Sequence, residues 1–179
     1  MLPPGHIEFT WASLNLLQRQ FGLFEDADYR LAALAAVLPD LIDKPLATFV
    51  LTDAEAALLY SHTALLHGGV WLAAAATGQL ERNLPYLLAF SGHLLADRMW
   101  KFRQTLCWPL RGRRFHRWKH VGSPEAIVQA YLAIIRDKPV LLTFEALGAL
   151  LLAWFILDRG LWQGETLAAF IKTGTFSET

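Results

Sequence analysis

Asn83–Asp97 reads NLPYLLAFSGHLLAD, an apolar run that carries one imidazole and one carboxylate near its end. Leucine and alanine dominate the run, and Asn83 with Pro85 supplies a helix-start signal. The run therefore predicts a helix. On that helix His93 and Asp97 are four residues apart and share one face, close enough for both side chains to bind one metal ion.

The rest of the chain has the same leucine- and alanine-rich character, interrupted by glycine and proline, and it lacks the sustained alternation of strands. The sequence predicts an all-α helical bundle of about six to seven helices. The expected helices cover about 6–20, 29–38, 52–77, 83–100, 123–137, 140–157 and 164–172. The chain suits one domain over 1–172, with 173–179 as a disordered tail.

Two local signals set the expected breaks and starts. Proline disfavours helix at the residue before it and cannot continue one, so the segment between Pro39 and Pro45 is predicted as an irregular break. Thr52 and Glu55 have the spacing of a capping box, which predicts the start of the helix that carries His62.

Composition favours association with a membrane. Hydrophobic residues make up 54% of the chain, charged residues 18%, and the mean hydropathy is +0.31. Val140–Leu157 has Glu145 as its single charge and is just long enough to cross a bilayer, although a buried helix of a soluble bundle fits the same pattern. The first residues, MLPPGH, lack the regions of a secretory signal, so the sequence predicts no export.

The formal net charge is zero, but the charges are unevenly distributed. Residues 1–97 hold ten acidic and four basic residues, whereas residues 98–120 hold eight basic residues and no acidic one. This basic segment is either a solvated loop or a surface that binds anionic substrates or membrane lipid, and in a membrane protein it would face the cytoplasm. Its candidate anion-binding residues are Arg98, Lys101, Arg103, Arg111, Arg113, Arg114 and Arg117.

Five side chains in apolar surroundings are candidate metal ligands. Divalent metals bind imidazole nitrogen and carboxylate oxygen, and a catalytic site needs about three protein ligands. Burial of Asp97 without a partner would be costly, and either a metal ion or pairing with Arg98 or Lys101 would offset that cost. A single cysteine, Cys107, excludes an intrachain disulfide and a cysteine-rich zinc module. The candidates are His6, Asp40, His62, His93 and Asp97.

Several short segments occur in a recognisable order. They resemble those of the bacterial and archaeal membrane-bound metal-dependent hydrolases, including inner-membrane, repressor-associated proteins of the YdjM type. The order of ligand types is more distantly similar to part of the zinc site of phospholipase C and P1-type nucleases. The resemblance covers roughly residues 3–110 and rests on Gly5-His6, Leu38–Asp43 (LPDLID), Ser61–Thr63 (SHT), Gly92–Asp97 (GHLLAD) and Cys107–Leu110 (CWPL).

The resemblance implies a phospholipase C/P1 nuclease-like helical core, a location at the inner (cytoplasmic) membrane and a site for one or two divalent ions, with zinc as the first choice. Asp97 would bridge to a second ion held partly by His6 or act as general base, and Asp43 would orient an imidazole. The first of these ions would be held by Asp40, His62 and His93.

Two departures argue against a three-metal site. The His-Arg-Gly run that family members commonly carry before the Thr-His-Ser segment is absent before His62. The two further histidines and the glutamate of the zinc phospholipases also have no clear equivalents, because His116 and His120 lie among basic residues that would repel a cation.

The sequence thus supports three hypotheses. The first is a membrane-associated metal-dependent hydrolase that acts on a phosphoester, lipid-derived or nucleotide, through a metal-activated water. The second is a non-enzymatic, membrane-associated protein that uses residues 98–120 to bind anionic lipid, nucleic acid or a regulatory protein. The third is a purely structural small membrane protein.

Overall fold

The computed structural model describes residues 1–51, 56–117, 123–137 and 139–176, and the fold is all-α, as the sequence predicts. Over these residues there is no strand, and eight α-helices occur where six to seven were expected, because the single turn α5 adds one. The helices are α1 (Pro3–Phe21), α2 (Tyr29–Pro45), α3 (Ala64–Ala76), α4 (Leu80–Ala96), α5 (Arg103–Leu106), α6 (Pro124–Asp137), α7 (Pro139–Asp158) and α8 (Gly164–Thr173).

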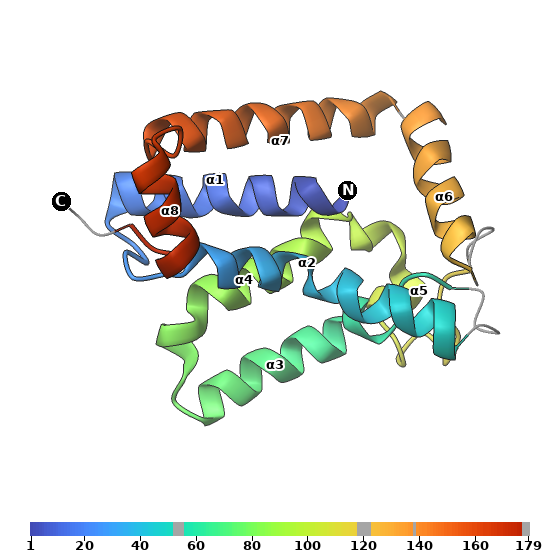
Figure 1. The fold of residues 1–179 in the computed structure, drawn as a ribbon. Coiled ribbons are helices and arrows are strands. Elements are labelled where there is room, and N and C mark those ends of the chain that lie inside the picture. The colour runs from blue at the N-terminus through green and yellow to red at the C-terminus, as the bar shows by residue number, and fades with distance from the viewer. Residues whose placement is uncertain (52–55, 118–122, 138, 177–179) are drawn as a thin grey trace.

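The helices stack in a layered order that leaves the two outer ones, α3 and α7, largely uncovered. Figure 1 shows α7 running beside α1, with α2 and α4 below them and α3 at the opposite side. The pairs α1–α7, α1–α2, α2–α4 and α3–α4 are in contact. The centre of the bundle is therefore the region where α1, α2 and α4 meet.

An aromatic cluster holds one end of this stack together. Tyr29 and Phe155 are fully buried, and Trp11, Phe170 and Phe176 pack against them. Such side chains dominate core energetics because each buries a large apolar area. Residues 174–176, expected in a disordered tail, belong to this core instead: Phe176 packs in it, and Gly174 O accepts a hydrogen bond from Tyr29 N.

The predicted break between Pro39 and Pro45 is wrong. Helix α2 continues through Pro39 and ends at Pro45, so Asp40 and Asp43 are helical. Proline removes one helix hydrogen bond, but packing of α2 against α1 and α4 outweighs this local preference. The Pro39 carbonyl accepts a hydrogen bond from Ser61 Oγ at 2.8 Å, which ties α2 to the segment that carries His62.

The helix expected over 52–77 is shorter than predicted. Thr52 and Glu55 lie outside the described residues, and α3 begins only at Ala64. Thr63 caps it by accepting a hydrogen bond from Leu66 N at 3.2 Å. His62 therefore lies in the 3₁₀ turn Tyr60–His62, ahead of the helix that the sequence assigns it to.

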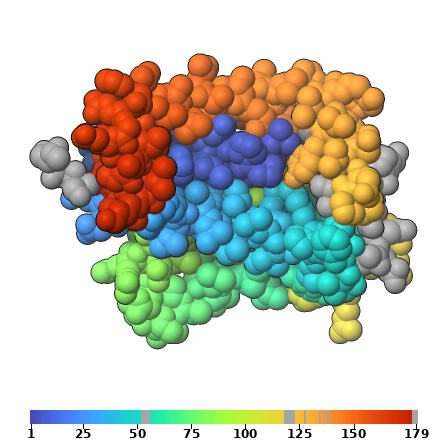
Figure 2. All heavy atoms as spheres, in the orientation of Figure 1, coloured from blue at the N-terminus to red at the C-terminus, as the bar shows by residue number. Residues whose placement is uncertain are grey.

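Among the described residues, α7 is the helix long and apolar enough to cross a membrane. Only 11% of its most apolar window is buried inside the bundle, and Figure 2 shows it along one outer edge of the molecule. Its carboxylate has a structural explanation: Glu145 Oε1 accepts a hydrogen bond from Leu2 N at 2.8 Å, at the start of α1.

Candidate metal centre

Four of the five predicted ligands meet in one buried cluster. Asp40 comes from α2, His62 from the turn before α3, His93 from the last turn of α4, and Asp97 from the residue that ends α4. One ligand atom from each lies within 4.8 Å of the others. This cluster could hold a metal ion.

The separations between the ligand atoms suit a single ion. His62 Nε2 and His93 Nε2 are 3.1 Å apart. Asp40 Oδ1 lies 3.6 Å and 3.9 Å from these two nitrogens, and Asp97 Oδ2 lies 3.8 Å and 3.4 Å from them. Tetrahedral coordination with bonds of 2.0–2.2 Å separates ligand atoms by about 3.3–3.6 Å. These five distances bracket that range, and all four atoms lie within 4.8 Å of one another.

Hydrogen bonds on the far side of each imidazole fix its tautomer. His93 Nδ1 lies 2.7 Å from the carbonyl oxygen of Ala36, and a carbonyl only accepts, so Nδ1 carries the proton. His62 Nδ1 lies 2.7 Å from Asp43 Oδ2, and the same reasoning protonates it. In neutral imidazoles both Nε2 atoms then present lone pairs to the centre of the cluster.

Four electron-rich atoms consequently face one another in a buried space. Asp40 Oδ1 is buried and finds no hydrogen-bond donor among the residues that the structure describes. A proton on one Nε2 would relieve only part of this repulsion, whereas a divalent cation would satisfy all four atoms at once. The donor set of two nitrogens and two oxygens fits such an ion.

The fifth predicted ligand, His6, lies beside these four residues, and its predicted role toward a second ion stays a prediction. Its ring stacks on His93, with ring centroids 4.0 Å apart. His6 Nε2 lies 3.2 Å from Asp97 Oδ1, the carboxylate oxygen that faces away from the other histidines. Burial lowers the pKa of His6, although contact with Asp97 partly opposes the effect.

Asp97 is better suited to a ligand role than to the predicted role of general base. Burial alone would raise its pKa, but contacts with His6 and with the α-amino group of Met1, 2.6 Å from Oδ1, outweigh burial. The pKa of Asp97 is held well below its ordinary value. A carboxylate with so low a pKa is a weak proton acceptor.

Asp43 positions His62. It is fully buried and accepts three hydrogen bonds, from Leu59 N at 2.5 Å, Ser61 N at 3.1 Å and His62 Nδ1. All three donors belong to the segment that carries His62, so the carboxylate holds that segment and its imidazole in place.

Two residues of the site were missed by the sequence reasoning. Lys44 donates to Asp40 Oδ2, the oxygen that points away from the cluster, and also to the hydroxyl of Tyr131 on α6. The i,i+4 spacing of Asp40 and Lys44 is visible in the sequence, but the predicted break hid it. Contact with Asp40 and Tyr131 raises the pKa of Lys44 against the opposing effect of burial.

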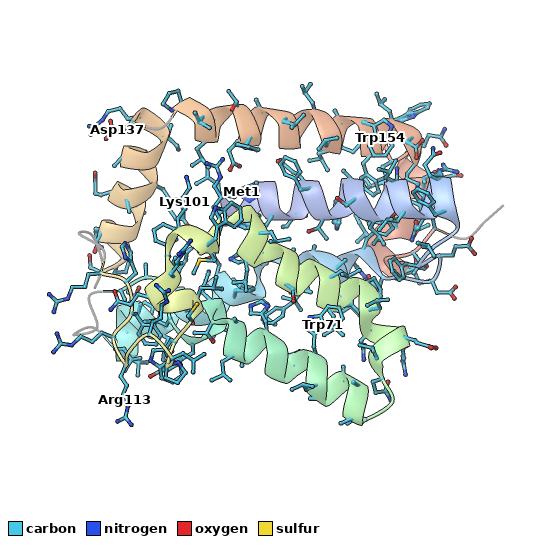
Figure 3. The ribbon with its side chains drawn as sticks, turned by 180° about the vertical axis from the view of Figure 1, so that it is seen from behind. Met1, Trp71, Lys101, Arg113, Asp137 and Trp154 are labelled. Atoms are coloured by element: carbon cyan, nitrogen blue, oxygen red, sulfur yellow. The ribbon has the colours of Figure 1, made fainter. Side chains whose placement is uncertain are left out.

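The basic segment divides into two parts. Arg98 and Lys101 line a cavity that also contains Asp40 and Asp97. Figure 3 shows Lys101 next to Met1, whereas Arg113 points away from the molecule at its edge. The remaining basic candidates are exposed outside that cavity lining: Arg103, Arg111, Arg113, Arg114 and Arg117.

His67, which the sequence excludes from the site, is a buried structural histidine. Its Nε2 lies 2.9 Å from the Ser61 carbonyl and its ring stacks on Phe90. Burial lowers its pKa to about 4.

This low pKa predicts a pH-dependent loss of stability. Unfolding restores an ordinary pKa of about 6.5, so the unfolded chain binds a proton that the folded chain refuses between those values. The free energy of unfolding should fall by up to about 3 kcal/mol as the pH drops from about 7 to 4, through this residue alone. Chemical denaturation of wild type and His67→Gln across this range should show a flatter profile for the variant; parallel profiles would contradict the prediction.

Fold and site together define a class: an all-helical protein with a buried centre of two histidines and two aspartates. Comparisons with protein-family models, curated proteins and solved structures return no match for this chain. The resemblance to the membrane-bound metal-dependent hydrolases and to phospholipase C therefore stays a prediction.

Proposed function

We propose that this chain is a membrane-associated, metal-dependent hydrolase that acts on phosphoesters. The observation that carries the proposal is the convergence of four acceptor atoms with both imidazole tautomers fixed by Ala36 O and Asp43. The sequence resemblance supports hydrolysis as the reaction, and the cations beside the cluster support an anionic substrate.

Zinc is the proposed ion, because imidazole nitrogen and carboxylate oxygen at these separations suit its tetrahedral preference. When bound, zinc polarises a phosphoryl oxygen and lowers the pKa of a water molecule. The protein keeps the ligands in place: Asp43 and Ala36 O orient the imidazoles, and Lys44 holds the outer oxygen of Asp40.

The membrane part of the proposal is supported by α7 and its surroundings. The helix is apolar over its length and mostly uncovered. Arg111, Arg113 and Arg114 are exposed, and Figure 1 places their segment at the same end of the molecule as the start of α7. Basic residues at one end of an apolar helix favour the cytoplasmic side of a membrane.

Hydrolysis of bis(p-nitrophenyl) phosphate and p-nitrophenyl phosphate by the zinc-loaded chain tests the proposal. Wild type should release p-nitrophenol, and Asp40→Asn should lower the rate by about 100-fold or more, because a metal ligand is lost. His67→Gln is the matched control: it alters a buried histidine outside the cluster and should retain the rate at neutral pH. Equal rates for wild type and Asp40→Asn would refute a metal-dependent mechanism.

A further inference from the structure

A cavity of about 520 Å³ adjoins the metal cluster and extends to the junction of α6 and α7. Its volume lies within the range of about 300–1,000 Å³ typical of small-molecule sites. Asp40 and Asp97 of the cluster belong to its lining, and so do Val140 and Leu141 at the start of α7.

Charged side chains of both signs line the cavity. Asp40, Asp97 and Asp137 are its acidic residues, and Lys44, Arg98 and Lys101 are its basic residues. The Arg98 guanidinium lies 4.8 Å from the ring of Phe144, and within the described part of the chain neither Arg98 nor Lys101 forms an ion pair. Two cations without carboxylate partners, next to a metal cluster, favour a phosphate group.

The backbone turns at Arg98, just after the end of α4. Arg98 has a φ of 55°, a left-handed conformation that costs a non-glycine residue free energy. It directly follows Asp97 and starts the turn Met99–Lys101. This conformation places Arg98 and Lys101 on the same cavity as the metal ligand that precedes them.

Apolar side chains also line the cavity, among them Leu58, Ala130, Val140 and Leu141. The last two are in the first turn of α7, the helix whose uncovered face is long and apolar enough to meet a membrane. This apolar part of the lining is thus continuous with the surface that would face lipid, which favours a hydrocarbon chain over a base or a sugar.

We infer that the cavity binds an amphiphile with a phosphate head, held between the metal cluster and Arg98 and Lys101, and one hydrocarbon chain that passes Leu141 toward α7. The inference rests on the proposed function for the position of the head and deepens it by naming the substrate class. Binding, which does not require turnover, tests it separately.

Titration calorimetry on the full chain measures its affinity for ethyl, hexyl and dodecyl phosphate, each below its micellar concentration. The three ligands share the phosphate head, so differences between them report on the hydrocarbon chain. Each buried methylene contributes about fourfold to affinity, so hexyl phosphate, with four more methylenes, should bind about 250-fold more tightly than ethyl phosphate. Dodecyltrimethylammonium, which has a chain but a cationic head, should not bind. Equal affinities of ethyl and dodecyl phosphate, or equal binding of the ammonium compound, would overturn the inference.

Two adjacent leucines provide a test variant and a matched control for the position of the hydrocarbon chain. Leu141 lines the cavity, whereas Leu142 lies outside that lining and is 42% exposed. Leu141→Gln should weaken the binding of dodecyl phosphate by about 10-fold or more, because two or more methylenes lose their apolar contact. The affinity for ethyl phosphate should stay unchanged. Leu142→Gln should behave as wild type, and equal losses in both variants would contradict the predicted path.

Two arginines provide a test variant and a matched control for binding of the phosphate head. Arg98→Asn removes the charge while asparagine tolerates the left-handed backbone, and Arg113→Asn removes an exposed charge outside the cavity lining. Arg98→Asn should weaken the binding of all three alkyl phosphates by about 10-fold or more, whereas Arg113→Asn should leave their affinities unchanged. Affinity that rises with the length of the hydrocarbon chain, without hydrolysis of any phosphoester, would refute the proposed function but not this inference. Hydrolysis with no effect of hydrocarbon length on affinity would refute this inference but not the proposed function.

Discussion

Purified protein is expected to hold about one divalent metal ion per chain, and His93→Ala is expected to lose it. Four-ligand zinc sites bind with about 10–16 kcal/mol, so one ligand accounts for about 2.5–4 kcal/mol, or a 100- to 1,000-fold loss of affinity. The effect should be at the upper end here, because His93 Nε2 faces all three other ligand atoms, at 3.1 Å, 3.4 Å and 3.9 Å. Elemental analysis and competition with a chelating dye would measure both quantities.

His67→Ala is the matched control for this experiment. His67 and His93 are both buried, and both form a hydrogen bond to a backbone carbonyl, but only His93 belongs to the cluster. Both substitutions should destabilise the protein, whereas only His93→Ala should remove the metal. A wild type that contains no stoichiometric metal after metal-replete purification would refute the centre.

Metal binding should also appear as stability. An ion that binds only the folded chain stabilises it by about 2.7 kcal/mol at a concentration 100 times its Kd. Removal of the ion leaves the acceptors of Asp40, His62 and His93 facing one another, so the melting temperature should fall with a chelator and recover with zinc.

The all-α fold was predictable because leucine- and alanine-rich runs separated by glycine and proline have few alternatives to helix. The signal failed where packing opposes a local rule. Pro39 should end a helix, yet α2 continues to Pro45 because its faces are buried against α1 and α4. Local propensity carries no information about that burial.

The candidate site shows the same division. His93 and Asp97 were identifiable as a pair from their spacing on one helix. Tyr131 was not, because it reaches Lys44 across 87 residues of sequence from another helix. The separate place of His6 was also beyond the sequence, since only the stacking of its ring on His93 puts it on the far side of Asp97.

Asp43→Ala is expected to cause the largest loss of stability of any single substitution in the site. The substitution leaves the Leu59 and Ser61 amides and His62 Nδ1 without their acceptor, in a place from which water is excluded. Removal of one partner from a buried, hydrogen-bonded pair costs about 3–5 kcal/mol. Urea denaturation of the metal-free protein would measure this cost apart from the effect of the ion.

Asp43→Asn separates the two roles of this residue, since an amide oxygen can still accept one hydrogen bond but carries no charge. Metal affinity should fall by about 10- to 100-fold, the usual effect of changing the group that orients a ligating imidazole. The variant should be more stable than Asp43→Ala, because an acceptor for the Leu59 or Ser61 amide remains. Unchanged metal affinity in Asp43→Asn would show that the charge of this carboxylate is not needed to orient His62 for metal binding.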